Sequence, residues 1–285
     1  MRAGKKRAGQ WVHRLRVGVS VALLWGVALP AALARWGGAS TVVLQDLTWT
    51  EVRQDLRAGK TTVLIPIGGT EQSGPYVALG KHNARVQALS VRIAQRLGNA
   101  LVAPVIAYVP EGSYAPMTSH MRFPGTITIP DGAFEATLAS AANSFRVHGF
   151  RNIVFLGDHG GYQRDVRLVV AQLNRQWRGT GARAFVPRAY YAASSQGFDQ
   201  ILRARGFPDS VIGTHAGLAD TSLLLAVAPQ MVRTRALQAA TQAPGAALGV
   251  YGGDPRHASA ALGRLGIHLI VERTVAAIRR DTQRH

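Results

Sequence analysis

The sequence contains no cysteine, which excludes a disulfide framework and any thiolate metal site. A bound metal must therefore be held by histidine and carboxylate side chains. No H-x-x-x-H motif, internal repeat or low-complexity tract is present, and no nucleic-acid motif accompanies the net charge of +18. A basic surface could attract polyanions, membranes or acidic substrates, but an arginine-rich composition with a solvated surface explains it more simply. With 47% hydrophobic and 17% charged residues, the chain is of the globular class.

Acidic residues are also missing from the first 34 positions, where six lysines and arginines precede an apolar run. Residues 1–16 are basic, and residues 17–34 are uncharged and end in Ala32-Leu33-Ala34. This order is typical of an export signal, and the final small residues favour cleavage over a retained membrane anchor at 17–34. Residues 35–44 are interpreted as a linker. The sequence thus predicts a periplasmic or extracellular protein that contacts the membrane only if this segment stays uncleaved.

From residue 45 to the end at residue 285, apolar strand patterns alternate with amphipathic helix patterns. Such alternation predicts an α/β domain whose mostly parallel sheet is covered by helices on both faces. Strands are expected at residues 61–67, 101–107, 126–130, 152–157 and 182–188. Helices are expected at residues 83–97, 131–148 (with Asp131 as N-cap), 162–177, 215–227 and 255–280.

Acids and imidazoles recur in glycine-rich loops near the ends of these strands. They are Glu71, His82, His120, Asp158, His159, His215 and Asp220. Taken singly, each has an ordinary structural explanation, such as an Asx turn for Asp158 or a helix-dipole contact for Asp220. Ligands of open α/β sheets bind beyond the carboxyl ends of the strands, so together these residues indicate a divalent-metal site.

Five ordered segments resemble the creatininase family of metal-dependent amidohydrolases, over about residues 45–280. They are IPIGGTEQSGPYVALGKH, FPGTITI, GDHGGYQ, HAGLADTS and GGDPRHAS. The resemblance implies a three-layer α/β/α sandwich, often a hexamer, with two zinc or manganese ions that help to hydrolyse small, often cyclic amides. It also implies that Glu71 and Asp220 correspond to carboxylates of the family's site and that His159 corresponds to a metal-binding histidine. His215 would then lie beside the reacting amide.

Two positions depart from the family pattern. Ser73 stands in place of a metal-binding histidine, and His82 stands in place of the aspartate that bridges both metals. A hydroxyl is a poor zinc ligand, and a neutral imidazole does not readily bridge two cations. The sequence therefore predicts one ion, zinc or alternatively manganese, held by Glu71, His82, His159 and Asp220. Leu218 and Tyr162 also replace residues that are often polar in these motifs.

The expected function is hydrolysis of a linear or cyclic amide in a small polar substrate by metal-activated water. His215 is the predicted general acid or base, with Asp220 as its orienting partner or as a ligand. Oxyanion and substrate contacts are assigned to Gly160 and Gly161, together with Ser73 and His120.

A degenerate family member that binds a small molecule or a partner without hydrolysis is the alternative. A third possible function is that of a membrane-tethered structural protein. The orientation of His82 separates the first two: a working site turns this imidazole toward Glu71 and His159, and a decayed site leaves it in solvent.

Overall fold

The structure, a computed structural model, describes residues 41–283, which belong to a compact unit spanning 38–285. The predicted export segment and most of the predicted linker lie outside the described residues. Residues 41–44 are described, and Val43 forms a parallel bridge with Val102 at the edge of the sheet. Across the described range, no helix is both long enough and apolar enough to cross a membrane.

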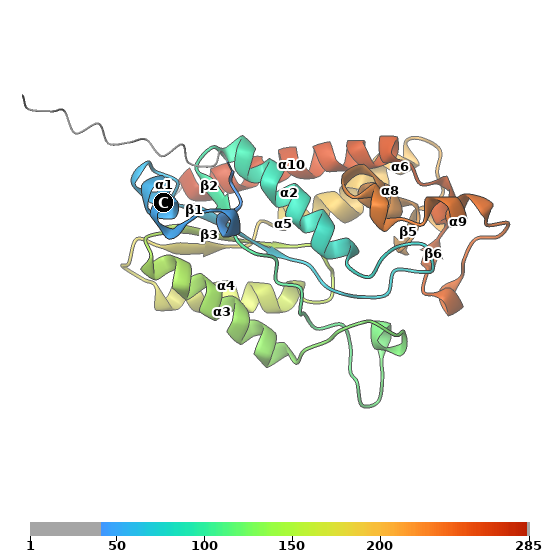
Figure 1. Ribbon diagram of the computed structural model, residues 1–285, viewed down its shortest axis with the longest axis horizontal. Coiled ribbons are helices and arrows are strands. Elements are labelled where there is room, and N and C mark those ends of the chain that lie inside the picture. Colours follow the sequence, from blue (N-terminus) through green and yellow to red (C-terminus); the bar gives the residue numbers. More distant parts are fainter. Residues whose placement is uncertain (1–40, 284–285) are drawn as a thin grey trace, which may run out of the picture. The chain divides into compact units, whose positions relative to one another are not determined.

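The helices and strands alternate through the first two thirds of this unit (Figure 1). The strands are β1 (Thr62–Ile67), β2 (Ala100–Val102), β3 (Asn152–Gly157), β4 (Arg183–Phe185), β5 (Gly213–His215) and β6 (Tyr251–Gly253). The first five helices are α1 (Trp49–Arg57), α2 (Lys81–Leu97), α3 (Asp131–Val147), α4 (Gln163–Gln176) and α5 (Arg188–Ala192). The others are α6 (Phe198–Arg203), α7 (Asp209–Ile212), α8 (Leu218–Val227), α9 (Thr234–Ala239) and α10 (Ala260–Gln283).

The main sheet has the order β2-β1-β3-β4, and all its neighbouring strands are parallel. Strands β1 and β3 are buried on both faces, as expected for continuous apolar runs in a parallel sheet. In Figure 1, α3 and α4 lie on one side of the sheet, and α2, α5 and α10 lie on the other. The predicted three-layer α/β/α architecture is thereby confirmed.

Each face of the sheet has its own apolar core. Phe134, Leu138, Val166 and Leu173 from α3 and α4 pack with Ile65 and Phe155 on one face. Val86, Leu89 and Ile93 of α2 pack with Leu64, Val154 and the inner side of α10 on the other. These helix residues recur every three or four positions, which is the spacing that predicted the helices from the sequence.

Two expected strands differ in the structure. The predicted strand at 101–107 ends at Val102, because Pro104 lacks the N–H group that a ladder needs, and pairing resumes only at Ile106. No strand forms at 126–130: Ile127 N–H donates to Thr70, whereas Ile129 N–H donates to Val109, so the segment crosses two different loops.

The predicted helix at 215–227 begins instead at Leu218, after strand β5 and a turn in which Ala216 has a φ of 54°. The helix expected from 255 starts at Ala260, behind a short 3₁₀ turn. Asp131 is the first residue of α3 and not its N-cap, which is Pro130.

Candidate metal centre

The candidate site lies where strands β1 and β3 end. The loop after β1 carries Glu71, and the loop after β3 carries His159. Asn83 of α2 holds the first loop in place, since its side-chain oxygen accepts the N–H of Gly69 and its amide donates to Thr70. The long segment between β2 and α3 adds two more groups, Glu111 at its start and His120 within a 3₁₀ turn.

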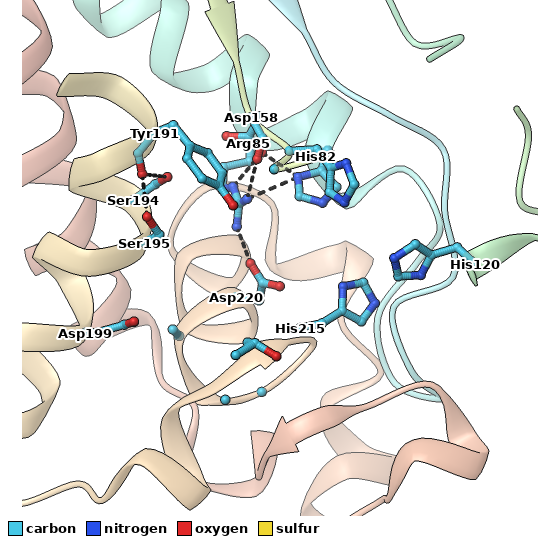
Figure 2. A pocket seen from close by; sticks show the side chains of 16 residues that line it. His82, Arg85, His120, Asp158, Tyr191, Ser194, Ser195, Asp199, His215 and Asp220 are labelled. Carbon is cyan, nitrogen blue, oxygen red and sulfur yellow. Dashed lines mark hydrogen bonds and ion pairs between the residues drawn. The ribbon is translucent and has the colours of Figure 1, made fainter. Parts of the chain in front are cut away.

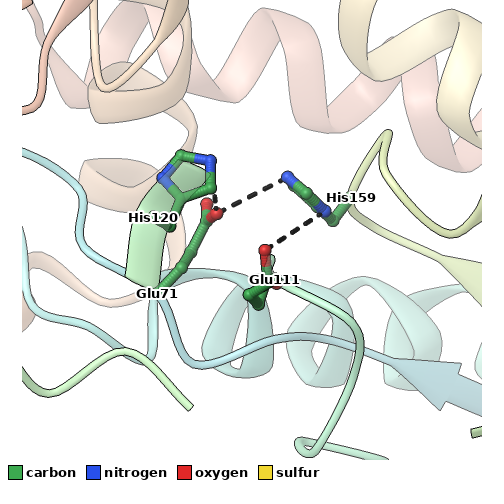
Figure 3. A group of neighbouring side chains, drawn as sticks. All are labelled: Glu71, Glu111, His120 and His159. Atoms are coloured by element: carbon green, nitrogen blue, oxygen red, sulfur yellow. Dashed lines mark ion pairs between the residues drawn. The ribbon is translucent and has the colours of Figure 1, made fainter. Parts of the chain in front are cut away.

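Four side chains from these segments converge, as Figure 3 shows: Glu71, Glu111, His120 and His159. One ligand-type atom from each lies within 4.8 Å of those of the other three. Nε2 of His120 is 3.1 Å and Nε2 of His159 is 3.5 Å from Oε2 of Glu71. Nδ1 of His159 is 3.7 Å from Oε2 of Glu111. Two imidazoles and two carboxylates form a donor set suited to zinc or manganese.

Three carboxylate oxygens in this group are buried without a hydrogen-bond partner among the described residues. Oε2 of Glu71 and both oxygens of Glu111 accept no hydrogen bond from the described residues. Buried polar groups in proteins are normally satisfied, and a buried carboxylate is especially unfavourable when it is not. A divalent ion could bind these three oxygens, so these side chains fit a metal centre.

The pKa values reflect how closely the carboxylates are packed. Burial and the neighbouring carboxylate of Glu71 raise the pKa of Glu111 to about 10. Burial also acts to raise the pKa of Glu71, but the Lys81 ammonium and the His82 imidazole outweigh it and hold that pKa well below its usual value. Burial lowers the pKa of His159 to about 4 and lowers that of His120 too, so both imidazoles are neutral, as metal ligation requires.

His82 is buried and faces the site, but carboxylates occupy both of its nitrogens. Nε2 lies 2.8 Å from Oε1 of Glu71, and Nδ1 lies 2.7 Å from Oδ2 of Asp158. The ring lies 5.2 Å from that of His159, between their centroids. His82, predicted from the sequence to be a metal ligand together with Glu71, His159 and Asp220, instead links Glu71 to Asp158 and lies outside the four-residue group.

Asp220 is likewise occupied, by two cations that sequence reasoning did not single out. Its Oδ2 accepts from Nζ of Lys81 at 2.9 Å, and its Oδ1 accepts from Nη1 of Arg85 at 2.7 Å. Lys81 is fully buried and also lies 3.4 Å from Oε1 of Glu71, while Nε of Arg85 donates to Asp158 at 2.8 Å (Figure 2). Burial would raise the pKa of Asp220, but Lys81 and Arg85 hold it well below its usual value.

His215 is near the four-residue group without belonging to it. Its Nε2 donates to the backbone carbonyl of Gln72 at 2.9 Å, so Nδ1, 3.6 Å from Oε1 of Glu71, keeps its lone pair. Burial and the Lys81 charge lower its pKa to about 3, which keeps the ring neutral at pH 7. Asp220 accepts the N–H of Ala216 and so stabilises the left-handed residue that follows His215.

A pocket opens beside the four-residue group, and the remaining predicted groups lie either in its wall or outside it. Gly160 lines the pocket, whereas the N–H of Gly161 is already donated to Nδ1 of His159. Ser73 is buried, does not line the pocket, and its hydroxyl has no hydrogen-bond partner among the described residues. His120, predicted as a substrate contact, lies in both the pocket wall and the four-residue group.

Tyr162 anchors the loop that carries His159. Its hydroxyl accepts the backbone N–H groups of Asp158 and His159, each at 3.0 Å, and lies 2.8 Å and 2.7 Å from the carbonyl oxygens of Ile67 and Gly68. The tyrosine thus replaces a polar residue of the family pattern by another polar group, which joins the ends of β1 and β3.

Sequence reasoning missed Glu111, Lys81 and Arg85. Glu111 stands at the start of a loop, as Glu71 does, one residue before the GSYAP segment that was singled out. Lys81 and Arg85 lie four residues apart and therefore on one face of α2. The same side of the helix carries the buried residues Val86 and Leu89. A charged pair beside such apolar residues was the sequence signal that could have indicated buried cations.

A cavity of about 340 Å³ opens beside the cluster. His120, His159 and His215 line one part of it, and the other part is lined by residues of α5, α6 and the π-helical turn Ala193–Gly197 that joins them. Figure 2 shows His120 and Asp199 at opposite sides of this space. A small molecule in the cavity would thus contact the candidate metal centre at one end only.

The layers and the site define an α/β/α protein with a carboxylate–imidazole metal centre at the end of a parallel sheet. A family model described as creatinine amidohydrolase matches residues 45–278. The chain belongs to the creatininase family.

Similar proteins agree with this assignment. A mycofactocin precursor peptide peptidase of Mycobacterium ulcerans (strain Agy99) is 30% identical over 256 residues, which cover 82% of this chain and 90% of that protein. A creatinine amidohydrolase of Pseudomonas putida is 26% identical over 201 residues, covering 68% of this chain and 75% of that protein.

Solved structures share the fold. A crystal structure of creatinine amidohydrolase superposes with a TM-score of 0.71 at 23% identity, covering 85% of this chain and 98% of that one. Two further creatininase structures, one titled as a manganese form and one as a Zn–Zn mutant form, have TM-scores of 0.68 and 0.69. They are 24% and 23% identical, and they cover 85% of this chain and 98% and 99% of theirs.

Proposed function

We propose that this protein is a metal-dependent hydrolase that cleaves an amide C–N bond in a small polar molecule. The observation that carries the proposal is the group of three buried, unpartnered carboxylate oxygens facing two neutral imidazoles at the wall of a cavity. Family membership supports hydrolysis, and the names of the relatives supply two examples of C–N bond cleavage, in a peptide and in creatinine.

We propose Glu71, Glu111, His120 and His159 as the ligands of one ion, zinc or manganese. When bound, such an ion lowers the pKa of its water to about 7 and polarises a carbonyl group. A second ion has no comparable place in this site. Both nitrogens of His82 are taken, Ser73 is a weak donor, and the ammonium of Lys81 already lies against Glu71.

His215 is the proposed proton carrier. Its Nδ1 lone pair is free because Nε2 donates to the Gln72 carbonyl, and the ring is neutral at pH 7. The imidazole can accept a proton as water adds to the carbonyl and return it to the departing nitrogen. Asp220 acts as a positioning residue, since it fixes the Ala216 turn behind this ring.

The non-catalytic alternative is less well supported by the orientation of His82. Only 3% of its surface is exposed, and its ring faces Glu71 and His159, where a decayed site would have turned it to solvent. We also propose that the protein is a homo-oligomer and, from its N-terminal sequence, that it is exported.

Metal content, measured by mass spectrometry on protein purified without chelators, tests the ligand set. We expect about one equivalent in the wild type and a loss of at least about tenfold in affinity in Glu111→Gln and His120→Ala, because each removes a direct ligand. Asp220→Asn is the matched control, since it changes a site carboxylate that is held by Lys81 and Arg85, and it should keep the ion.

An ion that remains in Glu111→Gln but is lost in Asp220→Asn would overturn the ligand assignment. A protein that stays metal-free after reconstitution with zinc or manganese would overturn the hydrolase proposal itself. Hydrolysis is then followed on a panel of small linear and cyclic amides, and His215→Asn should reduce kcat while metal content is retained.

A further inference from the structure

The half of the cavity away from the metal centre presents several hydrogen-bond acceptors, beside the Tyr191 hydroxyl, which can both donate and accept. Ser194 and Ser195 lie in the π-helical turn between α5 and α6, and both hydroxyls donate to the backbone carbonyl of Tyr191, at 3.0 Å and 2.8 Å. Thr214, also in the cavity wall, donates its hydroxyl proton to the carbonyl of Tyr251 at 3.1 Å. Each oxygen therefore offers only lone pairs to a ligand.

The charged donors of the wall are already engaged. The Nε, Nη1 and Nη2 groups of Arg85 contact Asp158, Asp220 and His82, and the nitrogens of His82 contact two carboxylates. The acidic groups Asp158 and Asp220 are in turn neutralised by Arg85 and Lys81. Because of these contacts, few positively charged groups of the described residues near α6 are free to bind a ligand in the cavity.

Asp199 is the carboxylate in this half that lacks such a partner. It lies in the first turn of α6, and it makes no hydrogen bond or ion pair with any described residue. Arg203, one turn further along α6, is instead paired with Asp209 of α7 at 2.6 Å. In Figure 2 the Asp199 carboxylate is directed toward the cavity, on the side where Ser194 and Ser195 lie. Partial burial raises the pKa of Asp199 to about 6, so at pH 7 this carboxylate is mostly ionised in a restricted space.

We propose that this half of the cavity is a subsite for an N–H-bearing organic cation, such as a guanidinium or alkylammonium group, with Asp199 as its counter-ion. The Ser194, Ser195 and Thr214 oxygens would accept its other N–H groups. Charge-assisted hydrogen bonds of this kind are stronger than neutral ones and give orientation as well as affinity. The inference deepens the proposed function: it assigns a substrate with a cationic end that is held away from the amide to be cleaved.

Binding of simple cations to the full chain tests the subsite without any turnover. Methylguanidinium and methylammonium are titrated and followed by ligand-observed NMR, with tetramethylammonium as a cation of equal charge and no N–H group. We expect saturable millimolar binding of the first two and binding at least about tenfold weaker for the third. No saturable binding of methylguanidinium to the wild type, or equal binding of tetramethylammonium, would overturn the proposal.

Variants then assign the binding to Asp199. Asp199→Asn should weaken methylguanidinium binding at least about tenfold, and Asp199→Glu should restore part of it. Asp55→Asn, which removes the same charge from α1 on the surface, is the matched control and should bind as the wild type does. Equal affinity in the wild type and Asp199→Asn would overturn the assignment, and a circular-dichroism melt shows that each variant is folded.

These outcomes are separable from those of the hydrolase proposal. Loss of the metal in Glu111→Gln leaves Asp199 and the serine oxygens in place, so methylguanidinium binding should persist there. If amides are not hydrolysed while the cation still binds at Asp199, the catalytic proposal fails and the subsite stands. If neutral and cationic amides are hydrolysed with equal KM and no cation binds, the subsite fails and the hydrolase stands.

Discussion

Glu111 shows how a single buried side chain couples the site to its surroundings. A Cβ atom at Gly69 would lie 2.5 Å from Oε1 of this carboxylate, so the glycine, at a φ of 150°, makes the room that Glu111 occupies. The carboxylate lies beside Glu71 and accepts no hydrogen bond from the described residues. Without an ion, such a group is most easily accommodated in its protonated form.

The stability of the metal-free protein should therefore depend on pH through Glu111. Its pKa is raised in the folded state, so above about pH 4.5 the unfolded chain loses a proton that the folded chain keeps up to about pH 10. Stability from this group is complete below the unfolded pKa and declines as pH rises, by at most about 1.4 kcal/mol per pH unit. Urea melts in EDTA should show this slope in the wild type and a flatter one in Glu111→Gln. Glu135→Gln on α3 should retain the wild-type slope, and equal slopes in all three proteins would contradict the assignment.

Among individual residues, the sequence predicted two of the four proposed ligands. Glu71 and His159 follow long apolar strands, and such strand ends are recognisable because their burial pattern is continuous. Glu111 and His120 lie in a long segment without regular structure, whose path depends on hydrogen bonds such as that from the Glu111 N–H to the Thr128 hydroxyl. Contacts of that kind join residues far apart in the chain, so periodicity does not indicate them. His82 and Asp220 were predicted as ligands and lie beside this group, where they contact buried cationic partners on α2 that were not foreseen.

Among the elements, α8 and α10 approach each other most closely at two glycines of α10. A Cβ atom at Gly263 would lie 1.8 Å from the backbone oxygen of Ser222, and one at Gly266 would lie 2.6 Å from Leu223 and 2.9 Å from Phe198. Helix α8 begins just after His215 and carries Asp220, so the position of α10 fixes how α8 presents both groups to the cavity. The sequence predicted both helices, but not that they touch through backbone atoms.

Gly263→Ala should therefore destabilise the protein severely, by about 3 kcal/mol or more, because backbone atoms have to move to admit the methyl group. Gly132→Ala is the matched control: Gly132 lies in α3 with open space around its Cβ position, so the change should be neutral or stabilising by up to about 1 kcal/mol. Thermal and urea melts of both variants give the comparison. A Gly263→Ala protein as stable as the wild type would mean that α8 and α10 are further apart than described.

For the whole molecule, the segment between β2 and α3 is the most distinctive surface feature. Residues 112–122, here called the arm, extend away from the layers in Figure 1 and contain exposed Tyr114 and Met117. These side chains are 67% and 59% exposed, and Tyr108 at the base of the arm is 60% exposed. The same arm carries His120, so a contact that covers it would also hold a proposed metal ligand in place.

If the protein is a homo-oligomer, the arm is the surface on which we expect assembly to depend. The double variant Tyr114→Ser/Met117→Ser should have a lower molar mass than the wild type by light scattering, because the loss of buried apolar area weakens association. Its metal affinity should fall as well, through the loosened His120. Val147→Ser/Leu168→Ser, which changes exposed apolar residues of α3 and α4, is the control of similar character. An unchanged mass in the arm variant would exclude the arm from the interface.

The two cations on α2 give the site a property that a dinuclear centre lacks. A metal ion is exchangeable: it leaves when its free concentration falls or when a stronger chelator competes for it. The side chains of Lys81 and Arg85 are covalently attached to the chain, so they keep Asp158 and Asp220 neutralised at every ion concentration. A low concentration of free zinc or manganese therefore removes only the ion itself. The cavity wall, the Ala216 turn and the Asp199 subsite stay assembled, ready for the ion to return.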